Sequence, residues 1–220
     1  QHYNWVQDNI KKVDKASNGK IGYIYIPDMG PEGLNEFSRY FYPQLDKEGL
    51  IIDDRANGGG NVSPMILERL SREPYRLTMR RGSARIGTVP DAVQVGPKVC
   101  LINKYSASDG DLFPWGFRAL GLGKLIGTRT WGGIVGISGS LPYMDGTDIR
   151  VPFFTSFDPK TGSWIIENHG VDPDILIDND PVKEWNGEDQ QLDRAIQEVM
   201  KELQNRKPLP GVPTPRDFSK

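Results

Sequence analysis

Apolar residues along this chain recur at two spacings, one typical of helices and the other of strands. Short runs that are wholly apolar, or that alternate with polar residues, predict strands at 20–26, 50–52, 99–102, 125–126 and 134–135. Apolar residues three or four positions apart predict helices at 4–15, 32–45, 64–70 and 188–206, and one that begins near Ser108. A hairpin is expected where 148–157 meets 163–167 across a turn at 158–162. The alternation of strands with helices predicts an α/β layered fold.

Two turns that follow predicted strands carry the candidate chemistry. The first, at 53–60, reads DDRANGGG, and its glycines allow backbone N–H groups to approach a ligand closely. It lacks the G-x-G-x-x-G spacing and the Walker lysine of nucleotide sites, and a plain turn is its alternative interpretation. The second turn leads into a helix at Ser108, where a serine hydroxyl is exposed beside helix N–H groups, as a nucleophile requires. A simple helix cap made by Ser106, Ser108 and Asp109 is the alternative there.

The composition narrows the classes of function. A net charge of −2 over 220 residues leaves no basic surface for nucleic acid. One cysteine and two scattered histidines do not supply an ordinary zinc site, so neither a metal nor another cofactor is expected. No apolar run approaches the ~20 residues of a membrane span, so no membrane partner is expected either. The first residue is Gln and no signal peptide is present, so the chain is interpreted as part of a longer protein.

Three blocks of sequence carry a resemblance to a known family. They read DDRANGGG at 53–60, NKYSASDGDLFPWGFRALGLGKLIGTRTWGGIVG at 103–136 and IIENHGVDPDI at 165–175. In this order they resemble the tricorn protease family and, more loosely, the C-terminal-processing serine peptidases. The resemblance covers nearly the whole chain and implies an α/β core of the crotonase-like (ClpP-like) type.

The resemblance assigns roles to residues at both turns. It implies that Ser108 is the nucleophile of a serine peptidase. The backbone N–H of Gly59 or Gly60 and that of Asp109 then form the oxyanion hole, and the Asp109 side chain is incidental to that role.

The base that activates the serine differs between the two branches of the family. Processing peptidases carry a lysine in a T-[FY]-G-K-G motif, but here the motif reads TWGGI and Gly133 occupies the lysine position. The tricorn branch uses a histidine from an upstream segment, outside this chain, with an acidic residue in support that matches Glu167. His169 is an alternative base, because residues two apart in a strand share a face, and a surface turn residue is its simpler interpretation. Without the upstream histidine, this chain alone is expected to be inactive or weakly active.

The predicted organisation is a lead-in helix at 1–18 that follows a missing upstream region, a peptidase core at 19–206 and a Pro-rich tail at 207–220. The expected function is that of a serine endopeptidase core which cleaves peptides or unfolded proteins through an acyl-enzyme. A catalytically degenerate ligand-binding or scaffolding domain on the same fold is the alternative. The resemblance further implies a histidine-bearing segment and a PDZ-like domain upstream, a homo-oligomer, and a cytoplasmic location, with a periplasmic location as the alternative.

Overall fold

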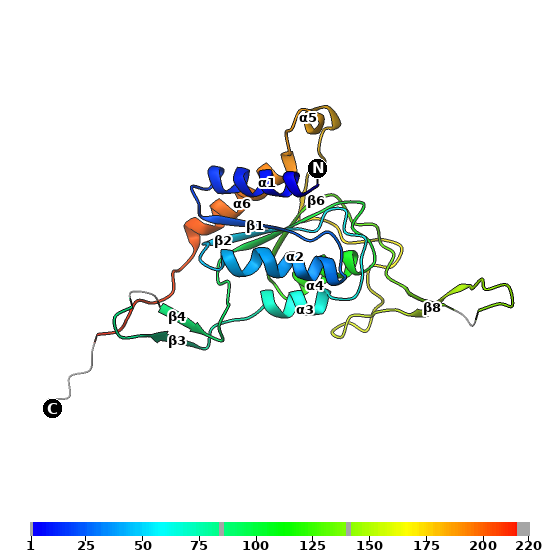
Figure 1. The fold of residues 1–220 in the computed structure, drawn as a ribbon, viewed down its shortest axis with the longest axis horizontal. Helices are drawn as coiled ribbons and strands as arrows, with labels where there is room; N and C mark the ends of the chain where they lie inside the picture. Colours follow the sequence, from blue (N-terminus) through cyan, green and yellow to red (C-terminus); the bar gives the residue numbers. More distant parts are fainter. Residues whose placement is uncertain (1, 84–85, 140–141, 215–220) are drawn as a thin grey trace.

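A parallel β-sheet forms the centre of the molecule in the computed structural model, which describes residues 2–83, 86–139 and 142–214. Its five strands lie in the order β1–β2–β5–β6–β9, and every neighbouring pair is parallel (Figure 1). The strands are β1 (Ile21–Tyr25), β2 (Gly49–Asp53), β5 (Lys98–Ile102), β6 (Gly123–Gly127) and β9 (Ile175–Leu176). Every residue of β1, β2 and β5 is buried, because helices cover both faces of the sheet.

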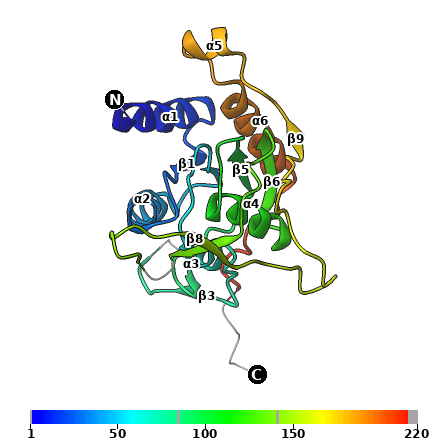
Figure 2. The same ribbon diagram turned by 90° about the vertical axis from the view of Figure 1, so that its right-hand side faces the viewer.

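The helices form two layers, one on each face of the sheet (Figures 1 and 2). The first layer consists of α2 (Pro31–Phe41), α3 (Ser63–Leu70) and α4 (Asp109–Ala119). The second consists of α1 (His2–Ala16) and α6 (Gln190–Asn205). The 3₁₀ helix η1 (Tyr42–Gln44) follows α2 directly, and the short helix α5 (Pro181–Trp185) stands beyond the second layer. Each layer encloses its own apolar core against the sheet.

The α6 helix shows how local sequence sets these elements. Leu192, Ala195 and Val199 are three or four positions apart and are buried against the sheet. The Asp189 carboxylate accepts a hydrogen bond from the Leu192 N–H at 3.0 Å and caps the helix. The helix therefore begins at Gln190, two residues after the predicted start.

Two antiparallel hairpins lie outside the central sheet (Figure 1). One pairs β3 (Arg76–Met79) with β4 (Ile86–Val89), and the other pairs β7 (Gly136–Gly139) with β8 (Arg150–Phe154). The β7–β8 hairpin extends away from the helical layers, and every residue of β8 is exposed.

The predicted pairing of 148–157 with 163–167 is confirmed beside the turn only, and the rest of it is wrong. The turn between them does close, since Asp158 N–H donates to the Ser163 carbonyl at 2.9 Å, but only Phe157 and Trp164 form a β-bridge beyond it. The edge of β8 pairs with β7 instead. The strand expected at 134–135 is also absent, because the N–H groups of those two residues donate to a side chain rather than to a neighbouring strand.

The predicted α/β fold with layered helices is confirmed, and its central sheet is parallel. The strands expected at 20–26, 50–52, 99–102 and 125–126 are all present in that sheet. No helix in the described ranges has the length and apolar character needed to cross a membrane. Residues 207–214 of the predicted tail contain neither helix nor strand, and 215–220 lie outside the described residues.

Candidate active site

The candidate site lies where β2 and β5 end side by side in the sheet. Asp53 is paired with Leu101, so the turns that follow the two strands leave the same edge together. The turns are joined directly, since Ala107 N–H donates to the Asn57 carbonyl at 2.8 Å and Ser106 Oγ donates to the Asp54 carbonyl at 2.8 Å. The sheet register thus brings the glycine-rich turn against the serine corner.

Ser108 occupies a strained backbone conformation at the head of α4. Its φ is 58° and its ψ is −119°, a combination that non-glycine residues rarely adopt. The residue is exposed, and its N–H donates to Asp111 Oδ2 at 2.9 Å. Sharp, strained turns of this kind present a nucleophile at the top of a helix.

The glycine-rich turn packs against this corner without room for a side chain. A Cβ atom on Gly59, whose φ is +95°, would lie 2.6 Å from Ser108 Cβ. The Gly59 N–H is already bonded to Asn57 Oδ1 at 2.9 Å. By contrast, the N–H groups of Gly60 and Asp109 make no hydrogen bond to another described residue. Of the three predicted oxyanion donors, Gly60 and Asp109 are therefore the pair with free N–H groups.

The side chain of Asp109 has a structural role that the sequence analysis treated as incidental. Its Oδ2 accepts the Ser63 N–H at 2.9 Å, and its Oδ1 accepts a short hydrogen bond from the Ser63 hydroxyl. Ser63 is the first residue of α3. The carboxylate therefore fixes the start of α3 while its own backbone N–H faces the glycine-rich turn.

Asp111 is a residue of the site that the sequence analysis missed. It is fully buried, and its carboxylate accepts N–H groups from Ser108 at 2.9 Å, Gly132 at 2.8 Å and Gly133 at 3.3 Å. The available signal was its position three residues after the serine, where an acidic side chain reaches back to the start of a helix. Its hydrogen bonds to residues 132–133 join positions 21 and 22 residues apart, so no local sequence pattern indicates them.

Glu167 binds the two loop residues that directly follow those bound by Asp111. Its Oε2 accepts the N–H of Ile134 at 2.7 Å and that of Val135 at 2.9 Å. The carboxylate is half-buried and makes no direct hydrogen bond to Ser108 among the described residues. The structure therefore links the two residues through the loop at 132–135.

The His169 side chain hydrogen-bonds neither to Ser108 nor to Glu167 among the described residues. Its Nε2 lies 2.8 Å from Asp172 Oδ2, and Arg129 Nε donates to the other oxygen of that carboxylate at 2.6 Å. These two hydrogen bonds, that of His169 first, hold the pKa of Asp172 below its usual value. His169 N–H donates to the Ile166 carbonyl at 3.0 Å in a turn, so the strand geometry that would have placed it beside Glu167 is absent.

A largely buried network of ion pairs joins Arg55, in the glycine-rich turn, to Asp53 and Asp189. The Arg55 guanidinium contacts Asp53 at 2.9 Å and 2.6 Å and contacts Asp189 at 3.0 Å and 2.9 Å. The Tyr23 hydroxyl also donates to Asp53, at 2.6 Å. The network ties the end of β2 to the start of α6, and the Arg55 guanidinium neutralises the charge of the fully buried Asp53.

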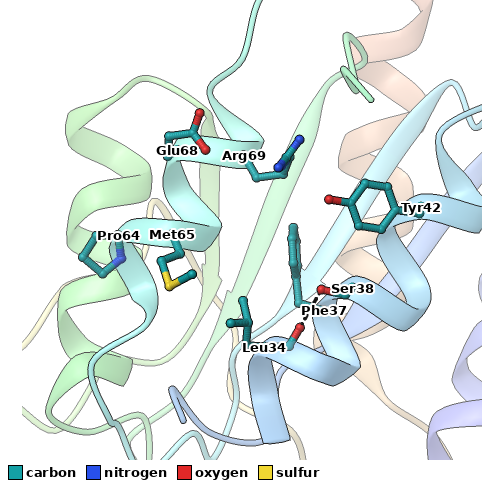
Figure 3. A pocket seen from close by; sticks show the side chains of 8 residues that line it. All are labelled: Leu34, Phe37, Ser38, Tyr42, Pro64, Met65, Glu68 and Arg69. Carbon is teal, nitrogen blue, oxygen red and sulfur yellow. Dashed lines mark hydrogen bonds between the residues drawn. The ribbon is translucent and has the colours of Figure 1, made fainter. Parts of the chain in front are cut away.

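One hollow of the described structure lies between α2 and α3 (Figure 3). It has a volume of about 530 Å³, and Leu34, Phe37 and Met65 give it an apolar lining. The Arg69 guanidinium lies 5.8 Å from the ring centre of Tyr42 at its rim. None of the predicted site residues lines this hollow.

A second hollow, of about 1040 Å³, lies at the carboxyl ends of the strands on the α1 side. Its lining includes Asn103 and Thr128, which follow β5 and β6, and the aromatic ring of Tyr25. No group of three or more potential metal ligands occurs among the described residues.

Asp54 carries the most unusual carboxyl group near the site. It is fully buried, and neither of its oxygens hydrogen-bonds to another described residue. Burial raises its pKa well above the usual 3.8, and the charges of Asp53, Asp109 and Asp111 raise it further. The folded protein therefore holds a proton on this carboxyl group more tightly than the unfolded chain does.

Replacing Asp54 by asparagine is expected to stabilise the protein at pH 8 and to leave its stability almost unchanged near pH 4. The folded pKa lies above the unfolded one, so the stabilising effect of the proton is complete below about pH 4 and declines as the pH rises toward the folded pKa. Within that window the wild type loses about 1.4 kcal/mol per pH unit relative to the variant. Urea unfolding of both proteins across this range measures the difference. A difference in unfolding free energy that does not change with pH would contradict a raised pKa of Asp54 in the folded protein.

This chain is similar to known peptidases along most of its length. Residues 20–177 match the family model described as Peptidase family S41. The chain is 45% identical to the tricorn protease of Thermoplasma volcanium, over 92% of this chain and 20% of that protein. It is 37% identical to tricorn protease homolog 1 of Streptomyces coelicolor, over 89% of this chain and 18% of that protein.

The structural comparison agrees with the sequence comparison. The crystal structure of the tricorn protease superposes with a TM-score of 0.84 at 43% identity, over 91% of this chain and 20% of that one. The chain thus spans about a fifth of the length of these relatives.

Proposed function

The chain belongs to peptidase family S41, and on this premise we propose that it is the nucleophile-bearing core of a serine peptidase. The observation that carries the proposal is the corner at Ser108. The serine is exposed at the head of α4 in a strained conformation, and Gly59 of the glycine-rich turn packs against it. The N–H groups of Gly60, in that turn, and of Asp109, the residue after the serine, make no hydrogen bond to another described residue. This arrangement offers a nucleophile and an oxyanion-binding site at one place.

The proposed chemistry is acyl transfer. Ser108 Oγ attacks the carbonyl carbon of a peptide bond while its proton passes to a base. The N–H groups of Gly60 and Asp109 bind the oxygen that becomes negatively charged, and each such donor stabilises the transition state by about 3 kcal/mol. The protonated base then delivers its proton to the leaving amine. Water hydrolyses the acyl-serine and regenerates the hydroxyl.

The proposed base is a histidine from a part of the polypeptide outside this chain. Gly133 lies where the processing peptidases carry their lysine, and among the described residues His169 hydrogen-bonds to Asp172 and not to Ser108, so neither position offers a base in contact with the serine. Glu167 is proposed to support the machinery through its two bonds to the loop at 134–135. The relatives are about five times longer than this chain, which leaves room for such a segment.

The remaining parts of the proposal concern the assembly. By likeness to the tricorn proteases, we propose that the substrate is a peptide or an unfolded protein. A histidine-bearing segment and a PDZ-like domain are proposed to lie in the same polypeptide. A homo-oligomer and a cytoplasmic location are proposed on the same ground.

Labelling with a fluorophosphonate probe, followed by mass mapping, tests the proposal. In the full-length polypeptide we expect covalent labelling at Ser108, because the probe reacts with a serine that has an activated hydroxyl and an oxyanion site. In this chain alone we expect labelling at least about 10²-fold slower, since the base is absent. A Ser108→Ala variant of the full-length polypeptide is the control and is expected to show no labelling.

The other outcomes separate the alternatives. Rapid labelling of this chain alone would place the base within it and make His169 the first residue to replace. A wild-type polypeptide that folds but is never labelled would contradict the peptidase proposal and favour a binding or scaffolding domain.

A further inference from the structure

Four consecutive backbone N–H groups, those of residues 132–135, point at two carboxylates. Asp111 accepts the first two, at 2.8 Å from Gly132 and 3.3 Å from Gly133. Glu167 accepts the next two, at 2.7 Å and 2.9 Å. A loop with four adjacent donors satisfied in this way has little freedom to move, because each rearrangement exposes an N–H group or leaves a carboxylate without partners.

The two carboxylates differ in what else they hold. Among the described residues, the Glu167 carboxylate accepts hydrogen bonds from the loop alone, whereas Asp111 also accepts the N–H of Ser108 at 2.9 Å, through the same oxygen that accepts Gly133. Asp111 is fully buried, and Glu167 is half-buried. The buried side chain of Asp111 therefore connects the backbone of the candidate nucleophile to the loop at 132–135.

We propose that Asp111 is a positioning residue which holds Ser108 in its reactive conformation by fixing it to the loop at 132–135. The inference rests on the proposed peptidase function. The positive φ of Ser108 is strained, and such a conformation persists only where the surroundings impose it. A hydrogen bond from its N–H to an ionised acceptor is of the strong, charge-assisted kind that can impose it.

Among the described residues, the partners of the Asp111 carboxylate are backbone N–H groups and not cationic side chains. Three N–H donors bind its two oxygens, and it lies in the first turn of α4, where the helix dipole favours a negative charge. Asparagine in its place would keep one acceptor oxygen. Its NH₂ group, however, would replace the other oxygen and cannot accept a hydrogen bond from a backbone N–H, so at least one of the three bonds is lost.

The experiment compares Asp111→Asn with the wild type in the full-length polypeptide. The measured quantity is the second-order rate constant for labelling of Ser108 by a fluorophosphonate. We expect it to fall about 10²-fold, because displacement of a reacting group by about 1 Å costs that much. The matched control is Asp189→Asn, another largely buried carboxylate that accepts an N–H at the start of a helix, at 3.0 Å from Leu192. It is expected to lose stability and to keep the labelling rate of its folded fraction within about twofold.

Hydrogen exchange gives a readout that does not depend on activity. In Asp111→Ala, which removes both acceptor oxygens, we expect faster exchange at the N–H groups of Ser108, Gly132 and Gly133. In Glu167→Gln we expect it at Ile134 and Val135 but not at Ser108.

The outcomes separate the inference from the proposed function. Unchanged exchange at Ser108 in Asp111→Ala, or a labelling rate of Asp111→Asn equal to that of the wild type, would overturn the positioning role. An unlabelled wild type would contradict the peptidase proposal alone. In that case the exchange pattern still decides whether Asp111 holds the corner.

Discussion

A Gly59→Ala variant is expected to lose about 10²-fold or more in the rate at which Ser108 reacts, measured as peptide hydrolysis and as probe labelling of the full-length polypeptide. The new Cβ would lie 2.6 Å from Ser108 Cβ, 2.8 Å from the Ala107 carbonyl and 3.0 Å from the Asp109 nitrogen. These atoms belong to the proposed nucleophile and to one oxyanion donor, so they cannot give way without moving the site. The φ of +95° adds backbone strain for any residue with a side chain.

The same turn supplies the control. Gly58 precedes Gly59, and a Cβ built on it meets no atom within 4 Å. Gly58→Ala is therefore expected to keep the rate within about twofold, because it adds one exposed methyl group and no contact. Equal losses in the two variants would indicate that the turn tolerates no substitution at all, and would contradict a specific close approach of Gly59 to the serine corner.

An Arg55→Ala variant is expected to lose about 3–5 kcal/mol of unfolding free energy in urea at pH 7. The arginine is 8% exposed and bridges Asp53, which is fully buried, and Asp189. Its removal leaves the Asp53 carboxylate in the interior with no cation to neutralise it. A loss of this size is a large fraction of the stability of an ordinary domain, so circular dichroism should establish first that the variant folds.

Lys11→Ala is the comparison for an exposed ion pair. Lys11 lies 3.1 Å from Asp8, and the two side chains are 75% and 70% exposed. Solvent screens such a pair, and we expect a change of less than about 1 kcal/mol. Similar effects of the two substitutions would contradict the importance of burial for the Arg55 network.

The sequence predicted those elements of the fold that carry a clear apolar pattern of their own. The apolar runs at 50–52 and 99–102 identified the two central strands, and the long stripe of α6 identified its helix. The two-residue strand β9 is too short to show a pattern. Residues 150–154 were assigned the wrong partner, because local alternation shows which face of a strand is exposed to solvent but not which strand pairs with it.

The residues of the candidate site likewise fall into those that a local sequence pattern indicates and those that it does not. Ser108 and the glycine-rich turn were found because their chemistry is local: a serine before a helix and three adjacent glycines after a strand. Asp111 was missed, because what distinguishes it is bonds to residues 21 and 22 positions away. The absence of partners around Asp54 is likewise a property of the packed interior and has no signature along the chain.

The pairing of β2 with β5 has a consequence for how the chain tolerates changes of length. The segment between α3 and β5 includes the β3–β4 hairpin, which lies outside the central sheet. The distance between the two turns of the candidate site is set by adjacent strand ends and not by the number of residues that connect them. Insertions or deletions in that hairpin should therefore be absorbed at the surface. A slip of β5 against β2 by one residue, in contrast, would carry Ser108 away from Gly59.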